Sequence, residues 1–364
     1  MGSIIGSTIR LSIFGESHGA SVGAVIDGFP SGIPVDEGFI AEQMARRSAV
    51  GKSLATPRKE PDKVEFVYGV FNGFTEGTPI CGLIRNTSTR SGDYGGLNIC
   101  PRPGHADYTA GIRDEGFQDY RGGGHFSGRL TAPLVFAGAM AGLALHKLYP
   151  HVRIGARILS IENIRDTGTV DSYEKLDLSD SAFPVYSSDL AQEMREAVGR
   201  ASKDGDSVGG VIEGWACGLP AGLGDPMFGS VESRLSSMLF SVPAVKGVEF
   251  GAGFGVTQMR GSAANDAFVF EDGRVRTRSN NNGGINGGIT NGMPLVFRCA
   301  VKPTPSIAAE QDTVNLKTGE AEKLRVHGRH DPSIIVRACP VIEAAASFTL
   351  LDMLLGSRIC RELE

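Results

Sequence analysis

The pattern of apolar and polar residues along the chain predicts alternating strands and helices. Short apolar runs and apolar–polar alternation predict strands at 9–14, 21–26, 64–70, 80–85 and 295–301. Amphipathic spacing predicts helices at 36–47, 190–200 and 231–240, the first with Asp36 at its N-cap and basic residues at its end, as the helix dipole favours. Residues 130–149, rich in alanine and glycine, predict a central helix that packs closely on every side, and 340–355 predict a last apolar helix.

Three segments recur in the same order in the two halves of the chain. Residues 21–34 are similar to 207–220, with eight of fourteen positions identical, 64–66 to 248–250, and 75–80 to 290–295. This predicts one domain over 1–364, with repeated halves at about 8–150 and 205–356 and a polar excursion at about 165–189 between them. Because antiparallel strands on either side of buried helices suit two such halves, we expect an α+β fold. It would be a layered β-α-β sandwich with antiparallel sheets flanking central helices.

Composition argues against several classes of protein. A net charge of −5 argues against nucleic-acid binding. The six cysteines include no C-x-x-C pair, so we expect reduced thiols in the cytoplasm. The N-terminus lacks a signal-peptide pattern and the most apolar stretch, 132–145, is too short to span a bilayer, so we expect neither export nor a membrane segment. No closely spaced ligand set predicts zinc. Fifty glycines, about twice the usual share, indicate tight turns and backbone close to a ligand.

The basic residues fall into two clusters. No lysine occurs between 85 and 129, where the cations are Arg85, Arg90, Arg102, Arg113, Arg121 and Arg129. Arginine in a glycine-rich segment favours bidentate recognition of carboxylate or phosphate. Acidic residues are interleaved, and we expect them to pair with about half of these arginines. A second cluster, which a solvated helix end would equally explain, consists of Arg46, Arg47, Lys52, Arg58 and Lys59.

Three histidines lie in glycine-rich loops, namely His18, His105 and His330. Loops present side chains to ligands and imidazole exchanges a proton near neutral pH, so these are candidate acid–base groups; a structural role is the alternative. Two further loops, 280–288 and 302–306, offer backbone amides, side-chain amides and a lysine that together could hold a phosphate and a polar ring. The residues alone therefore predict a duplicated enzyme that binds a small polyanion.

A set of short motifs points to one family. They lie at 14–19, 27–32, 46–47, 58–64, 77–80, 90–94 and 102–107, and in the second half at 283–288, 302–307 and 328–332. In this order and spacing they resemble the chorismate synthase family over nearly the whole chain. The resemblance implies a carbon–oxygen lyase that eliminates phosphate from 5-enolpyruvylshikimate 3-phosphate in a 1,4-anti reaction to give chorismate, the last step of the shikimate pathway. It also implies a requirement for reduced FMN with no net redox change, and a cytoplasmic homotetramer.

The resemblance also implies roles for individual residues. His18 would donate a proton to the departing phosphate, His105 would stabilise or protonate the reduced flavin, and Asp331 would help flavin N5 accept the C6 hydrogen. The residues implied to hold the substrate are Arg47, Lys52, Arg58, Arg102 and Arg129. Those implied to bind FMN are His125, Phe126, Ser127, Asn265, Gly287, Lys302, Pro303, Thr304, Pro305, Ser306 and Arg329.

One motif departs from the family pattern. At residues 123–131 the family usually has Gly-Gly-Arg-Ser-Ser-Ala-Arg-Glu-Thr. This chain has His125 in place of the first arginine, Phe126 in place of a serine and Leu130 in place of the glutamate. A catalytically weakened paralogue that binds FMN or the polyanion is therefore an alternative, as is a phosphate-releasing lyase without flavin. No dinucleotide-binding fingerprint occurs, so we expect a monofunctional enzyme that takes reduced flavin from an external source.

Overall fold

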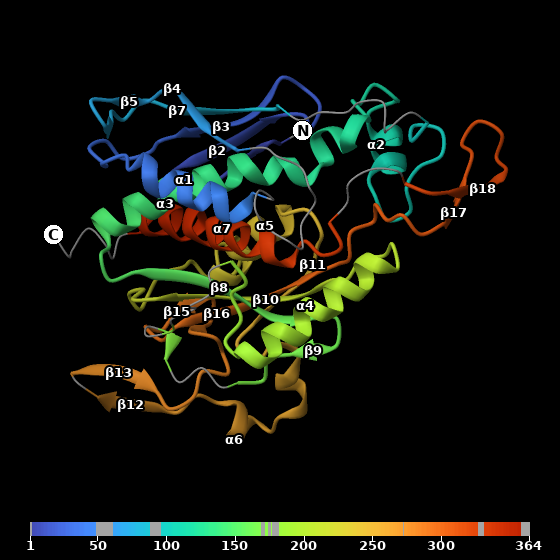
Figure 1. Ribbon diagram of the computed structural model, residues 1–364. Coiled ribbons are helices and arrows are strands. Elements are labelled where there is room, and N and C mark those ends of the chain that lie inside the picture. The colour runs from blue at the N-terminus through green and yellow to red at the C-terminus, as the bar shows by residue number, and fades with distance from the viewer. Residues whose placement is uncertain are drawn as a thin grey trace.

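Two antiparallel sheets enclose a layer of helices (Figure 1). The computed structural model describes residues 2–48, 61–87, 96–168, 172–173, 176, 182–271, 273–326 and 331–357. The first five-stranded sheet has the order β1 (Ile4–Ile5), β2 (Arg10–Gly15), β3 (Ser21–Asp27), β7 (Ile80–Arg85), β4 (Val64–Tyr68). The second has the order β11 (Val245–Phe250), β16 (Leu295–Val301), β10 (Gly210–Cys217), β8 (Arg153–Ile161), β9 (Ile164–Arg165).

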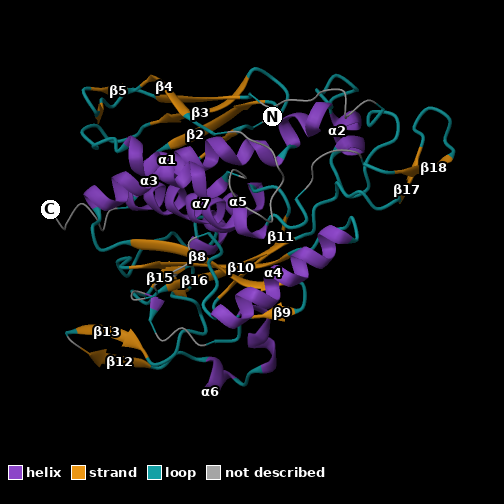
Figure 2. Cartoon of the chain, in the orientation of Figure 1, coloured by secondary structure: helices purple, strands orange, loops and turns teal. Residues whose placement is uncertain are grey.

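Four helices fill the space between the sheets (Figure 2). They are α1 (Glu37–Arg47), α3 (Thr131–Leu148), α5 (Val231–Ser241) and α7 (Ile335–Gly356). The α3 and α7 helices are apolar on nearly all sides and cross closely, because Gly138 leaves room for Ala344. Both are long and apolar enough to cross a membrane by composition alone, but they are the buried core helices of this fold. The predicted β-α-β sandwich is confirmed.

Smaller elements surround the sandwich. Helix α4 (Ser188–Lys203) packs on β8 and β9. Two short helices are α2 (Asp107–Arg113) and α6 (Gly261–Ala264), and three 3-10 turns are η2 (Arg121–Phe126), η3 (Gly128–Leu130) and η5 (Gly253–Gln258). Four two-stranded pairs are β5 (Val70–Phe71) with β6 (Phe74–Thr75), β12 (Phe268–Glu271) with β13 (Arg274–Thr277), β14 (Ile285–Asn286) with β15 (Ile289–Thr290), and β17 (Gln311–Val314) with β18 (Ala321–Leu324).

Local chemistry explains where the predicted elements begin. The Asp36 carboxylate caps α1 by accepting a hydrogen bond from the Phe39 amide at 3.0 Å, as predicted. The last helix begins at Ile335, five residues before the predicted start at Pro340, so this proline lies inside the helix rather than in its first turn. Strand β8 was not predicted, because its residues from Ala156 onward are buried on both faces and show no alternation.

The two sheets share one topology. The order β2-β3-β7-β4 in the first sheet corresponds to β8-β10-β16-β11 in the second. Thr75 accepts from the Ile33 amide and donates to the Pro30 carbonyl. In the second sheet Thr290 makes the same two bonds, with the Leu223 amide and the Pro220 carbonyl.

This geometry corrects the sequence alignment of the repeat. Pro30 corresponds to Pro220, so the first segment is displaced by four residues from the pairing of 21–34 with 207–220. Gly28 and Gly218, both at positive φ, then take equivalent places. Because β8 has the place in its sheet that β2 has in the other, we propose that the second copy begins at Arg153 and that the excursion is an insertion within it. The shared topology supports the proposed duplication.

Candidate active site

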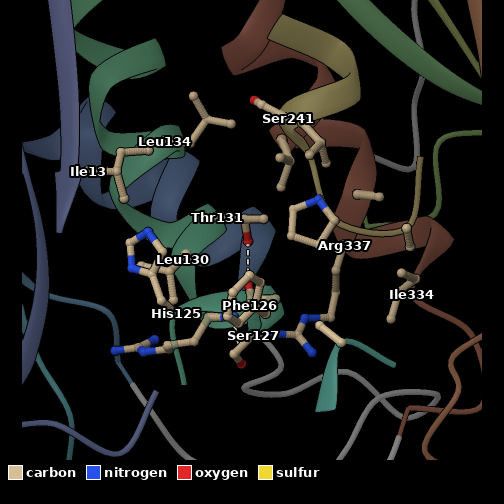
Figure 3. A pocket seen from close by; sticks show the side chains of 18 of the residues that line it. Ile13, His125, Phe126, Ser127, Leu130, Thr131, Leu134, Ser241, Ile334 and Arg337 are labelled. Atoms are coloured by element: carbon tan, nitrogen blue, oxygen red, sulfur yellow. Dashed lines mark hydrogen bonds between the residues drawn. The ribbon is translucent and has the colours of Figure 1, made fainter. Parts of the chain in front are cut away.

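A large cavity lies at one end of the helix layer. It has a volume of about 970 Å³ and is lined by the C-terminal ends of α1 and α5 and the N-terminal ends of α3 and α7. Apolar side chains form much of its wall. Figure 3 shows Ile13, Leu130 and Leu134 on one side of the cavity, with Ser241 and Ile334 across from them. Charged side chains, serines, threonines and glycines form the rest of the wall.

The first charged group on this wall joins three separate elements. Arg47 ends α1, Asp62 precedes β4, and Arg129 lies in η3 just before α3. The Asp62 carboxylate accepts from Arg47 Nη1 at 2.6 Å and pairs through its other oxygen with Arg129. Burial alone would raise the pKa of Asp62, but the two guanidinium groups hold it below its usual value. Asp62 is therefore a carboxylate that neutralises part of an arginine pair.

The second charged group centres on Asp107. Arg102 donates to both oxygens of this carboxylate, each at 2.7 Å, and His105 Nδ1 lies 2.7 Å from Oδ1. Burial would raise the pKa of Asp107, but these hydrogen bonds hold it well below its usual range. Asp107 accepts a hydrogen bond from a protonated Nδ1 and so favours the tautomer that leaves Nε2 of His105 for a ligand, while Arg102 Nη2, 3.1 Å from the same Nδ1, is a competing donor. Arg102 also donates to Ser306 Oγ at 2.9 Å, which ties residues 302–306 to the same group.

Asp331 belongs to a third ion pair. Arg337, on α7, donates to Asp331 Oδ2 at 2.5 Å and to the Arg47 carbonyl at 2.9 Å. The Thr304 hydroxyl donates to the Asp331 carbonyl at 2.8 Å. These bonds connect Asp331 both to the arginine pair and to residues 302–306.

His18 lies just behind the cavity wall. It is buried, and its Nδ1 is 3.2 Å from Ser17 Oγ. Gly122, which lines the cavity, packs on the His18 ring so closely that a Cβ there would lie 2.1 Å from it. The position of the His18 ring therefore depends on a glycine that leaves it this space.

The cavity gathers most of the predicted site residues that the structure describes. It is lined by Arg47, Arg102, His105, His125, Phe126, Ser127, Arg129, Lys302, Thr304, Pro305, Ser306 and Asp331. Pro303 is not among the lining residues, although its neighbours on both sides are. Lys52, Arg58 and Arg329, together with His330 and Arg90, lie outside the described residues.

Two predicted cofactor residues lie away from this cavity. Neither Asn265, which follows α6, nor Gly287, between β14 and β15, is part of its lining. The loop 280–288 is not part of this lining either, and that it joins 302–306 around one ligand stays a prediction. Its polar groups serve its own structure: Asp266 accepts from the amides of Asn281 and Asn282 at 2.8 and 2.9 Å.

Comparison with known proteins identifies the family. The sequence profile of chorismate synthase matches residues 9–355. The chain is 44% identical to the chorismate synthase of Dehalococcoides mccartyi over 99% of this chain and 98% of that one, and 46% identical to that of Thermococcus gammatolerans over 96% and 97%. The chain belongs to the chorismate synthase family. A crystal structure of a chorismate synthase superposes with a TM-score of 0.76 at 28% identity, covering 97% of this chain and 93% of that one.

The chorismate synthase motif that departs from the family pattern lies on the cavity wall. His125 Nδ1 is 2.9 Å from the Gly15 carbonyl, which therefore accepts from this nitrogen. The guanidinium carbon of Arg113 lies 5.5 Å from the centre of the Phe126 ring. Leu130 adds to the apolar part of the wall. All three replacements, His125, Phe126 and Leu130, therefore line the cavity.

Sequence patterns in this chorismate synthase homologue did not reveal the roles of Asp62 and Arg337, which line the cavity, or of Asp107, which pairs with the lining residues Arg102 and His105. Asp62 and Asp107 are inside quoted motifs, and Arg337 follows the last motif by one helical turn, so proximity to those motifs was the available signal. Ion pairing was also more extensive than the predicted half. All five described arginines from 85 to 129 pair with an acidic side chain, three of them at the exposed rim. Burial explains the other two, since a buried guanidinium requires a counterion.

No group of three histidine, cysteine, aspartate or glutamate side chains is placed to hold a metal ion within the described part of the chain.

Proposed function

We propose that this member of the chorismate synthase family eliminates phosphate from 5-enolpyruvylshikimate 3-phosphate to give chorismate, the last step of the shikimate pathway, with reduced FMN as cofactor. The observation that carries the proposal is the convergence of Arg47, Arg102, Arg129, His105 and Asp331 on one cavity in a chain of this family. The relatives named above are chorismate synthases by name. The substrate, cofactor and mechanism are the finer part of the proposal.

The charge of the cavity suits this substrate. It carries two carboxylates and a phosphate of about −1.5 to −2 charge. Arg47 and Arg129 present a buried pair of guanidinium groups, and such groups bind carboxylate and phosphate through two parallel hydrogen bonds. His18 would give a proton to the departing phosphate, because an uncharged or singly charged leaving group departs more readily.

The cavity also fits a flavin. Its volume of about 970 Å³ lies at the upper end of the range for ligand sites, so it can hold a flat ring system beside the substrate. Leu130 and Leu134 offer an apolar surface to such a ring, while Lys302 and Ser306 offer a cation and a hydroxyl to its polar edge and phosphate. Residues 125–127, 302, 304–306 and Arg329 would hold the cofactor. Reduced FMN, when bound, supplies transient electron donation to the substrate without net redox change.

The protein's own part in the chemistry is to hold and move protons. Asp107, by accepting a hydrogen bond from Nδ1 of His105, would leave Nε2 as the atom that holds or gives a proton at the edge of the flavin. Arg337 holds the carboxylate of Asp331 in one orientation, ready to assist removal of the C6 hydrogen. Apolar side chains around both groups exclude water and strengthen these electrostatic interactions.

The remaining features of the proposal concern partners and location. The enzyme is monofunctional, works in the cytoplasm as a homotetramer, and takes reduced flavin from an external source, with no nucleic-acid or membrane partner. Because Asn265 and Gly287 are not part of the cavity of a single chain, their role in cofactor binding requires a neighbouring copy.

An anaerobic assay tests the proposal. The protein is mixed with chemically reduced FMN and 5-enolpyruvylshikimate 3-phosphate, and phosphate and chorismate are followed together. Equal release of both, absent without reduced FMN, is expected. Binding of both ligands without release would favour the weakened paralogue, and release of phosphate without flavin would favour a lyase of another kind.

A further inference from the structure

The cavity arginines share one arrangement. Each described arginine in its lining is ion-paired with an aspartate, in the pairs Arg47–Asp62, Arg129–Asp62, Arg102–Asp107 and Arg337–Asp331. Within this set Asp62 is the one carboxylate that two arginines share. Its position between them gives it a role that the elimination chemistry does not assign.

Asp62 holds two helices in a fixed relation. Its Oδ2 accepts from Arg47 at the end of α1, and its Oδ1 accepts from Arg129 just before α3. Arg47 also donates from Nε to Thr131 Oγ1 at 2.9 Å, and Arg129 from Nε to Asn86 Oδ1 at 2.9 Å. Both guanidinium planes are therefore fixed before any ligand arrives, and the cavity receives a prearranged pair of cations.

The backbone at Asp62 is unusual. Its φ of +50° lies in the left-handed region, which residues other than glycine rarely adopt. Such a conformation persists where surrounding interactions determine it, and it is concentrated at ligand sites. Here the two ion pairs supply these interactions, because they hold the carboxylate between α1 and α3.

The buried arginine pair Arg47 and Arg129 would destabilise the folded protein without the carboxylate of Asp62. Burial lowers the pKa of Arg47 to about 10, and the positive charges of Arg337 and Arg129 contribute in the same direction against the attraction of Asp62. Asp62, Arg47 and Arg129 are only 2%, 4% and 5% exposed, so water screens the repulsion weakly. An anion must therefore be near the two guanidinium groups for the folded state to be stable.

We propose that Asp62 is a built-in counterion that positions Arg47 and Arg129 for an anionic group of the ligand and limits how tightly that group binds. The phosphate or a carboxylate of the ligand approaches the same pair from the cavity, and Asp62 offsets part of its attraction. The inference rests on the proposed function only in requiring that the cavity take a phosphate- or carboxylate-bearing ligand. Asp62 is thus a positioning residue.

The test removes the negative charge of Asp62 by substitution and supplies inorganic phosphate from solution. Asp62→Asn keeps the shape of the side chain and removes the carboxylate that Arg47 and Arg129 share, so the Tm in chloride buffer should fall by roughly 5 °C or more. Inorganic phosphate should then bind about tenfold more tightly than to the unaltered protein, measured by calorimetry, because a repelling charge is gone. Phosphate should also recover most of the lost Tm.

The matched control is Asp166→Asn. Asp166 is 1% exposed and pairs with the buried Arg157, but neither residue lines the cavity. This variant should lose Tm as well, with phosphate affinity unchanged and no recovery by phosphate. A third variant, Asp62→Glu, keeps the charge and should bind phosphate within about twofold of the unaltered protein.

The outcomes separate the inference from the proposed function. If Asp62→Asn loses stability and phosphate neither binds more tightly nor recovers the Tm, Asp62 is purely structural and the inference fails. Failure of Asp62→Asn to fold in both chloride and phosphate buffers, while Asp166→Asn folds in both, also overturns it. If the phosphate results are as expected and the unaltered protein makes no chorismate, the proposed function fails and the anion site stands.

Discussion

Substitution of Gly122 by alanine tests whether the space around His18 is needed for activity. Gly122 has φ +59°, and a Cβ at this position would lie 2.1 Å from both Nδ1 and Cε1 of His18. Ordinary contacts begin at 3.4 Å. The ring must therefore retreat by about 1 Å, and a displacement of that size from a reacting group costs on the order of 10²-fold in rate. This corresponds to about 2.7 kcal/mol of lost transition-state stabilisation.

The matched control for this prediction is Gly116→Ala. Gly116 also has positive φ, at +83°, but no atom lies within 4 Å of the place that an alanine methyl group would take. Alanine in the left-handed region costs about 1 kcal/mol at either site, so both variants should lose Tm, and Gly122→Ala should lose more because its Cβ also meets the His18 ring. Only Gly122→Ala should also lose kcat in the anaerobic chorismate assay, by about 10²-fold. Equal activity of the two variants would refute the reasoning that His18 must keep this position.

Three further predictions concern packing and the Asp107 group. A Cβ at Gly138 would lie 2.2 Å from Ala344 Cβ, so Gly138→Ala should destabilise the protein by about 1–3 kcal/mol in urea denaturation. Gly199→Ala, on α4 with open space around it, should instead stabilise the protein by up to about 1 kcal/mol. If both substitutions changed the free energy of unfolding in the same direction, the close crossing of α3 and α7 would be contradicted. Asp107→Asn should lower kcat by about 10²-fold or more through loss of the fixed His105 tautomer, and unchanged kcat would remove that role. The pKa of Asp107 is lowered in the folded state, so its stabilisation is present above about pH 4 and is lost as the pH falls through the folded-state pKa. In that window the free energy of unfolding of Asp107→Asn should fall less steeply with decreasing pH than that of the unaltered protein, with slopes that differ by up to about 1.4 kcal/mol per pH unit. Equal slopes would contradict the lowered pKa of Asp107.

The sequence predicted the layers of the fold well, because each central helix and most core strands have a pattern of their own. Strand 295–301 and helix 231–240 agree with β16 and α5 within one residue. Strand β8 was missed because its buried faces remove the alternation that identifies a strand. The repeat was recognised, but its first segment was aligned four residues out of place. Glycine and valine recur at several offsets there, and only the hydrogen bonds of Thr75 and Thr290 decide among them.

The candidate site was predicted unevenly for a physical reason. Residues inside recognisable motifs, such as Arg102 and His105, do line the cavity. Their partner Asp107 was overlooked because an acidic residue among arginines looks like an ordinary surface counterion until burial is known. Arg337 was overlooked because it lies on an apolar helix outside every motif. In both cases the missing information was three-dimensional: which carboxylate neutralises which guanidinium inside the fold.

The duplicated topology accounts for where the cavity is and why its walls differ. Arg47 is the last residue of α1 and Ser241 the last residue of α5, while Leu130 and Ile334 directly precede α3 and α7. All four line the cavity, so it forms where equivalent ends of the two halves meet. Two identical walls would bind a ligand in two equivalent orientations. Arginine in one half and serine at the equivalent place in the other remove that equivalence, so the proposed anionic substrate would place its charge on the α1 side. Under the proposed function, the difference between the repeats, rather than their similarity, would therefore orient the substrate.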